Sequence, residues 1–189
     1  STDGSLAILQ TLSLSIPRIE IISQTNSGHG ASLLKGYELA FADEWIFQID
    51  SDYQYTVNSF STLWNNRNGY DLLIAEREER NASVFRNMAT SVASNLVVAL
   101  YGDGIKDINC PYRLIRSDKL ALALQKIDKN SFAPNILVAA YFLKNNFRIF
   151  SITASAKRNI LNRKSKMSFY ILKGCIKTFT DTILFRFKI

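Results

Sequence analysis

The chain has 189 residues, of which 47% are apolar and 21% charged, a composition that suits one globular domain with a buried core. Cys110 and Cys175 lie far apart without metal-type spacing, which indicates two reduced thiols, and the single histidine, His29, excludes a histidine metal cluster. The sequence contains no run of 18 or more apolar residues and therefore predicts no membrane span.

The net charge of +7 is concentrated near the C-terminus. Residues 1–143 hold 12 Lys and Arg against 15 Asp and Glu, whereas residues 144–189 hold 11 Lys and Arg against one acid, Asp181. Such asymmetry indicates an anionic partner at the basic end. Because that end lacks a glycine-rich or aromatic RNA-binding signature, the sequence favours a membrane surface over nucleic acid.

The first half of the chain predicts alternating helices and strands. Ser5 is the expected N-cap of the first helix, and Pro17 ends that helix. Gly28 and Gly30 precede the second helix, and glycines there let backbone N–H groups approach a phosphate or a sugar. The expected elements are a helix at 5–16, a strand at 18–24, a helix at 31–42, a central strand at 45–49, a helix at 57–66 and a strand at 70–75.

The second half continues the alternation. Glycines at 102 and 104 are expected to stop a long apolar helix. The expected elements are that helix at 86–101, short strands at 105–107 and 111–116, helices at 119–125 and 134–144, and a last strand at 147–154. The alternation predicts an α/β layered fold.

The strand at 45–49 ends in a polar tip. Because alternate side chains of an extended chain point the same way, Asp50, Asp52 and Gln54 can offer oxygens to one point. Mg²⁺ and Mn²⁺ prefer oxygen ligands, and open α/β sheets bind ligands at strand ends of this kind. The alternative is an ordinary solvated turn, since Asp-x-Asp is common.

The order of motifs resembles family 2 glycosyltransferases of the GT-A fold, and in particular the polyprenyl-phosphate sugar transferases similar to dolichol-phosphate mannose synthase. The resemblance covers residues 1–166 and implies a Rossmann-like layered sheet flanked by helices. The motifs that carry it are Ser-Thr-Asp-Gly-Ser at 1–5, Asn26-x-Gly28-x-Gly30 with Gly36 beyond, Asp50-x-Asp52-x-Gln54, Arg77, Arg86, and Asp107 followed by Arg113.

The resemblance implies roles for these residues. Asp50, Asp52 and Gln54 would hold Mg²⁺ or Mn²⁺ on the diphosphate of a nucleotide-sugar donor. Arginine forks suit phosphate oxygens, so the implied phosphate contacts are Arg77, Arg86 and Arg113. A surface charge is the alternative for Arg77.

Asp107 is the implied catalytic residue, either as a general base or as a group that orients the acceptor. Its role stays open, because a lipid phosphate acceptor is already ionised and needs no base.

The chain departs from the family pattern in two places. The acceptor-binding segment corresponds only loosely to Arg158, Ser165 and Lys166, for which a basic surface loop is the alternative. A βαβ unit that precedes the Ser-Thr-Asp segment in the family is not in the sequence, so we expect an N-terminally incomplete catalytic domain whose first strand is missing.

The last 23 residues, 167–189, predict an amphipathic helix. Apolar residues recur at spacings of three or four with Lys and Arg between them, which suits a helix in a membrane interface. The alternative is a helix packed on the domain's own core. We expect a catalytic domain at 1–166 followed by this membrane-proximal helix.

The resulting hypothesis is an inverting, metal-dependent glycosyltransferase, peripheral or anchored at the cytoplasmic face of the membrane. Its expected partners are a nucleotide-sugar and a polyprenyl phosphate. The alternatives are transfer to a growing surface glycan, and a truncated, non-catalytic remnant that docks on membranes or partner enzymes.

Overall fold

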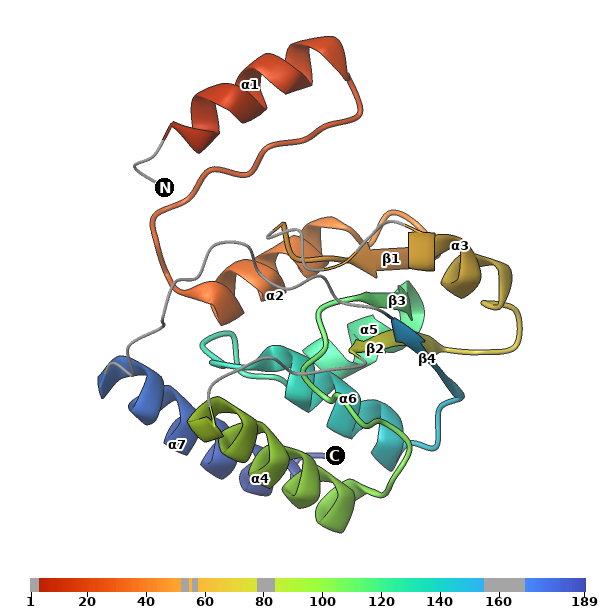
Figure 1. Ribbon diagram of the computed structural model, residues 1–189, viewed down its shortest axis with the longest axis vertical. Coiled ribbons are helices and arrows are strands. Elements are labelled where there is room, and N and C mark those ends of the chain that lie inside the picture. Colours follow the sequence, from red (N-terminus) through yellow and green to blue (C-terminus); the bar gives the residue numbers. More distant parts are fainter. Residues whose placement is uncertain (1–3, 52–54, 56–57, 78–83, 155–168) are drawn as a thin grey trace.

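The computed structural model describes residues 4–51, 55, 58–77, 84–154 and 169–189, with the backbone alone at 77, 84–90 and 169–171. Helices and strands are interleaved along the chain, and helices surround a small sheet (Figure 1). The elements are α1 (Ser5–Ser15), α2 (His29–Leu39), β1 (Trp45–Gln48), α3 (Asn58–Asn65), β2 (Leu72–Arg77), α4 (Val84–Tyr101), β3 (Arg113–Arg116), α5 (Ser117–Leu124), α6 (Pro134–Lys144), β4 (Ile149–Ala154) and α7 (Phe169–Phe185).

The four described strands form one mixed sheet in the order β1-β3-β2-β4. β3 pairs antiparallel with both β1 and β2, whereas β2 and β4 run parallel. The interior strand β2 reads Leu-Leu-Ile-Ala through Ala75, and these four residues are fully buried. A continuous apolar run is what a strand covered on both faces requires. The predicted α/β class, a sheet flanked by helices, is confirmed.

Helix α6 forms the centre of the helical layer. Its residues Pro134 to Leu143 are all buried, and it packs against α2, α4, α5 and α7. A helix that is apolar on every side must be enclosed in this way, and Pro134 in its first turn gives up only an N–H that the helix would leave unpaired. The helix expected at 134–144 is confirmed with both bounds.

Helices α4 and α7 lie side by side along one flank of the molecule (Figure 1). The α7 face that turns inward carries Gly174, Thr178, Thr182 and Phe185, all buried. Tyr101, at the end of α4, donates a hydrogen bond of 2.5 Å to the carbonyl of Thr182. One face of the C-terminal helix therefore packs on the domain. This packing agrees with the alternative given above for residues 167–189, a helix packed on the domain's own core.

Three expectations for the strands are wrong. The segments at 18–24 and 105–107 are not strands, and β1, expected to be central, lies at an edge of the described sheet. A strand needs a partner as well as β-branched residues, and Ile19 and Ile21, only half-buried, have no neighbouring strand among the described residues. The segment at 105–107 instead forms part of the loop that leads into β3.

Helix α1 forms as expected from its apolar spacing, but Gly4 rather than Ser5 occupies its N-cap, and none of its residues is buried. It stands apart from the other elements (Figure 1). The formation of α1 therefore follows from its local sequence pattern and not from burial against other elements.

The contact between Tyr101 and Thr182 predicts a pH-dependent stability. Burial raises the pKa of Tyr101 to about 12, although the charge of Arg186 opposes the rise. The unfolded chain releases this proton near pH 10 and the folded chain only near pH 12, so the stability present below pH 10 falls across that interval. Tyr101→Phe should cost about 1 kcal/mol at pH 7 and show a smaller fall between pH 10 and 12 in urea titrations.

Thr180→Ser, an exposed change on α7, serves as the control and should keep the wild-type stability and pH profile. An equal alkaline fall in wild type and Tyr101→Phe would contradict the assignment.

Candidate active site

The structure describes only part of the predicted metal set. Asp50 lies two residues after the end of β1 and is half-buried, whereas Asp52 and Gln54 lie outside the described residues. Among the described residues, no three of His, Cys, Asp and Glu gather closely enough to hold a metal ion. The metal set therefore stays a prediction.

The other predicted site residues differ in how far they are described. Arg77 ends β2 and Arg86 lies in the first turn of α4, each with its backbone alone described. The acceptor-binding candidates Arg158, Ser165 and Lys166 lie outside the described residues. Their implied phosphate contacts stay predictions.

Arg113 occupies a setting different from the one expected. Its side chain is fully buried, and its guanidinium donates to three main-chain carbonyls, those of Cys110, Ile108 and, at 2.9 Å, Asn135. A buried cation is tolerated where charge-assisted hydrogen bonds satisfy it. In this structure Arg113 fixes the loop at 108–110 to the start of α6, and its described contacts are with these carbonyls rather than with an open phosphate site.

Asp107 lies in the same loop and is 2% exposed. Its carbonyl accepts the N–H of Cys110 at 3.0 Å. Burial raises the pKa of the Cys110 thiol, and the charge of Asp107 raises it further. Asp107 therefore belongs to the loop that Arg113 holds, and its catalytic role stays a prediction.

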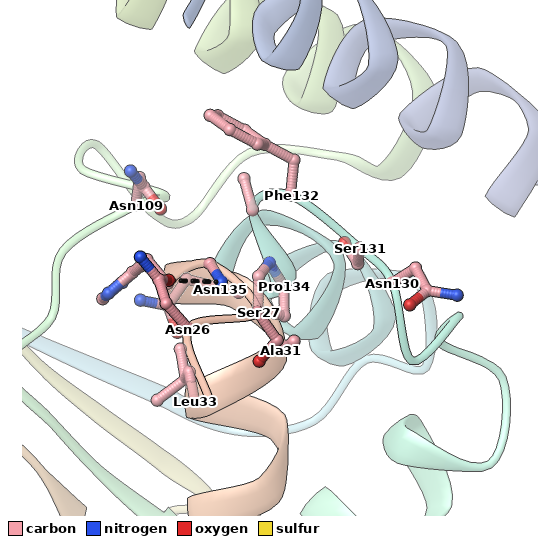
Figure 2. A pocket seen from close by; sticks show the side chains of 14 residues that line it. Asn26, Ser27, Ala31, Leu33, Asn109, Asn130, Ser131, Phe132, Pro134 and Asn135 are labelled. Atoms are coloured by element: carbon pink, nitrogen blue, oxygen red, sulfur yellow. Dashed lines mark hydrogen bonds between the residues drawn. The ribbon is translucent and has the colours of Figure 1, made fainter. Parts of the chain in front are cut away.

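A cavity of about 680 Å³ lies between the N-termini of α2 and α6 (Figure 2). Asn109, from the loop that Arg113 holds, closes another side. The loop entering α2 is shaped by Asn26, whose side chain accepts the N–H of Gly28 at 3.0 Å, and Gly28 itself has a φ of 91°. The lining residues are Asn26 to Ala31, Leu33, Asn109 and Asn130 to Asn135.

Glycine at position 30 allows the two helix ends to meet. A Cβ at Gly30 would overlap the carbonyl oxygen of Ser131 and lie 2.9 Å from that of Phe132. Gly30 thus permits a close approach between two stretches of protein backbone, whereas the expected approach of a phosphate or a sugar stays a prediction.

The cavity is electrically unusual because its lining contains no Asp, Glu, Lys or Arg. His29 is its single titratable side chain, and the other polar groups are Asn and Ser. The N-termini of two helices supply partial positive charge there. The arrangement suits sugar hydroxyls or an anionic oxygen, held by neutral donors and helix ends.

A buried polar chain connects this cavity to the acidic end of β1. The Tyr37 hydroxyl contacts the side-chain oxygen of Gln48 and lies 3.3 Å from that of Asn135, which lines the cavity. Burial raises the pKa of Tyr37; the charge of Arg113 lowers it and that of Asp50 raises it. Tyr37 thus contacts both Gln48, the last residue of β1, and Asn135 in the cavity lining.

Sequence reasoning missed Tyr37, Gln48 and Asn135. The signal was present in two of them, since Gln48 interrupts the apolar strand at 45–49 and Asn135 interrupts the apolar helix at 134–144. A polar residue in a buried element usually has a partner, and here the partner is Tyr37.

The family follows from comparison with known proteins. Residues 1–132 match the family model described as "Glycosyl transferase family 2", and this match covers more than half of the chain. The chain belongs to glycosyl transferase family 2.

The curated relatives include undecaprenyl-phosphate 4-deoxy-4-formamido-L-arabinose transferases. The proteins from Photorhabdus laumondii and Pectobacterium atrosepticum are 24% and 25% identical over 132 residues, which is 69% of this chain and 40% and 39% of theirs. The chain thus spans about two fifths of the length of the curated relatives it matches.

The solved structures that the fold resembles include two of glucosyl-3-phosphoglycerate synthase from Mycobacterium tuberculosis. One contains phosphoglyceric acid (TM-score 0.53, 14% identity), and the other contains Mn²⁺, UDP-glucose and glycerol 3-phosphate (TM-score 0.51, 15% identity). Each similarity covers 98% of this chain and 65% of the other. The GT-A fold expected from the sequence is confirmed.

The buried contacts of Arg113 predict that this residue stabilises the folded protein. Arg113→Lys replaces the planar fork with one ammonium and leaves buried carbonyls without donors, so the free energy of unfolding should fall by about 3 kcal/mol or more in urea titrations. Arg116→Lys, at a half-buried residue of the same strand whose charge can still pair with Asp118, should cost about 1 kcal/mol or less.

A stable Arg113→Lys protein that no longer binds nucleotide-sugar would instead restore the phosphate-binding role expected from the sequence.

Proposed function

We propose that this chain is part of a glycosyltransferase that moves a sugar from a nucleotide-sugar to a polyprenyl phosphate. The observation that carries the proposal is the family match over residues 1–132, a segment whose sequence includes Asp50, Asp52 and Gln54. The relatives named as undecaprenyl-phosphate transferases support a lipid-linked acceptor. The relative structure that contains Mn²⁺ and UDP-glucose supports a metal and a nucleotide-sugar.

The donor set suits a divalent cation. Two carboxylates and one amide oxygen, spaced at alternate positions, are the ligand types that Mg²⁺ and Mn²⁺ prefer. Such a cation, when bound by Asp50, Asp52 and Gln54, supplies charge neutralisation for the departing diphosphate.

The chain's own residues would position the substrates. In the proposed inverting reaction, an oxygen of the lipid phosphate attacks the anomeric carbon as the bond from that carbon to the diphosphate oxygen breaks. The phosphate is already ionised, so this step requires no proton transfer to Asp107. Arg77 and Arg86 would contact the leaving diphosphate. The neutral cavity beside Asn135 would hold uncharged hydroxyls or a phosphate oxygen without competition from acidic side chains.

The proposed place of action is the cytoplasmic face of a membrane, where nucleotide-sugars and lipid phosphates meet. The protein would be peripheral or anchored there. None of the helices in the described part of the chain is both long and apolar enough to cross a bilayer.

The direct test is transfer of label from a panel of UDP- and GDP-sugars to a short polyprenyl phosphate by the full chain with Mn²⁺ or Mg²⁺. Label should enter the lipid fraction, and EDTA should abolish the transfer. Asp52→Ala should lower the rate by about a hundredfold or more, because the diphosphate charge then lacks compensation. Asp43→Ala, an exposed acid on the approach to β1, is the matched control and should retain wild-type activity.

Each rival hypothesis has its own outcome in this assay. Metal-dependent hydrolysis with no label in lipid, but label in an added glycan, would favour the surface-glycan transferase. No hydrolysis or transfer with any donor would favour the non-catalytic remnant.

A further inference from the structure

Helix α7 exposes an apolar stripe on a side other than the one that packs. Leu172, Ile176 and Phe179 are 39%, 59% and 43% exposed, and Ile183 continues the row half-buried. At about 100° per residue these four positions fall within roughly 60° of helix surface. The packed face uses Gly174, Thr178, Thr182 and Phe185, so the stripe is additional to what the domain core requires.

The charges of α7 are arranged around this stripe. Lys173 is exposed beside it, and Arg186 and Lys188 follow the end of the helix. The single acid, Asp181, lies about 170° from the middle of the stripe and is paired with Lys177 at 2.7 Å. An apolar row flanked by cations, with its acid turned away and neutralised, complements a surface that is apolar inside and anionic outside.

We propose that the α7 stripe Leu172–Ile176–Phe179–Ile183 docks the enzyme onto an anionic lipid bilayer, with α7 lying in the plane of the interface. The inference deepens the proposed function and rests on it for the choice of lipid as partner. Charge complementarity supports the same choice, because residues 144–189 carry 11 Lys and Arg against one acid.

The packing of α7 would bring a docked bilayer close to the cavity. A Cβ at Gly174 would overlap the ring of Phe132, so the helix rests on that ring at this point. Phe132 also lines the cavity, and Figure 2 shows its ring extending from the cavity wall toward the helices above. A bilayer held by the opposite side of α7 therefore lies one helix away from the cavity, within reach of a lipid-linked phosphate.

Vesicle co-sedimentation tests the surface without requiring catalysis. The full chain should bind vesicles of phosphatidylcholine with 30% phosphatidylserine, and Ile176→Ser/Phe179→Ser should weaken partitioning by at least about tenfold. Lys173→Gln/Lys188→Gln should weaken binding to the anionic vesicles by roughly fivefold per cation and leave the weak binding to pure phosphatidylcholine unchanged.

The matched control is Leu39→Ser/Leu122→Ser, which removes two exposed apolar side chains from α2 and α5 and should bind like wild type. Thermal melts should agree for all three variants, since every substituted residue is exposed. Equal loss in the control, or wild-type binding by Ile176→Ser/Phe179→Ser, would overturn the proposal. So would a wild-type dimer that this variant converts to a monomer, since the stripe would then bind a second copy of the chain.

Vesicle binding without transfer activity would refute the proposed function alone, and transfer without stripe-dependent binding would refute this inference alone.

Discussion

The guanidinium of Arg113 is the group on which the candidate site depends most directly. Its three hydrogen bonds join the loop before β3 to the first turn of α6, so Asn109 and Asn135 are held on two sides of one cavity. Removing a charge from water is costly unless hydrogen bonds replace the lost hydration. The three carbonyls meet that cost, and the same bonds set the distance between the cavity walls.

Charged and neutral side chains occupy different parts of the candidate site. Asp50 lies shortly after β1, whereas the cavity lining is neutral and receives positive potential from the N-terminal ends of α2 and α6. Tyr37 lies between them, touching Gln48 on one side and Asn135 on the other. The neutral lining leaves the cavity free of carboxylates, which would repel an anionic group.

The sequence predicted best the elements whose signals are local. Helix α6 was found to both bounds, because Pro134 marks its start and its apolar run allows only a buried helix. The segment at 18–24 failed because a strand is defined by a partner, which its own residues do not reveal. The sequence assigned Arg113 to phosphate binding. A guanidinium can donate to phosphate oxygens and to main-chain carbonyls alike, and only the folded structure shows that Arg113 donates to carbonyls. Asn135 and Tyr37 meet across 98 positions of sequence, a distance that no spacing pattern covers.

The presence of one histidine in the chain, located in the cavity lining, has a practical consequence. An imidazole gives proton and nitrogen resonances well separated from those of other side chains, so a spectrum of this protein contains one such set, from His29. Titrating nucleotides, sugars or lipid phosphates while following that single resonance would report occupancy of the space between the two helix ends, without labels attached to either partner.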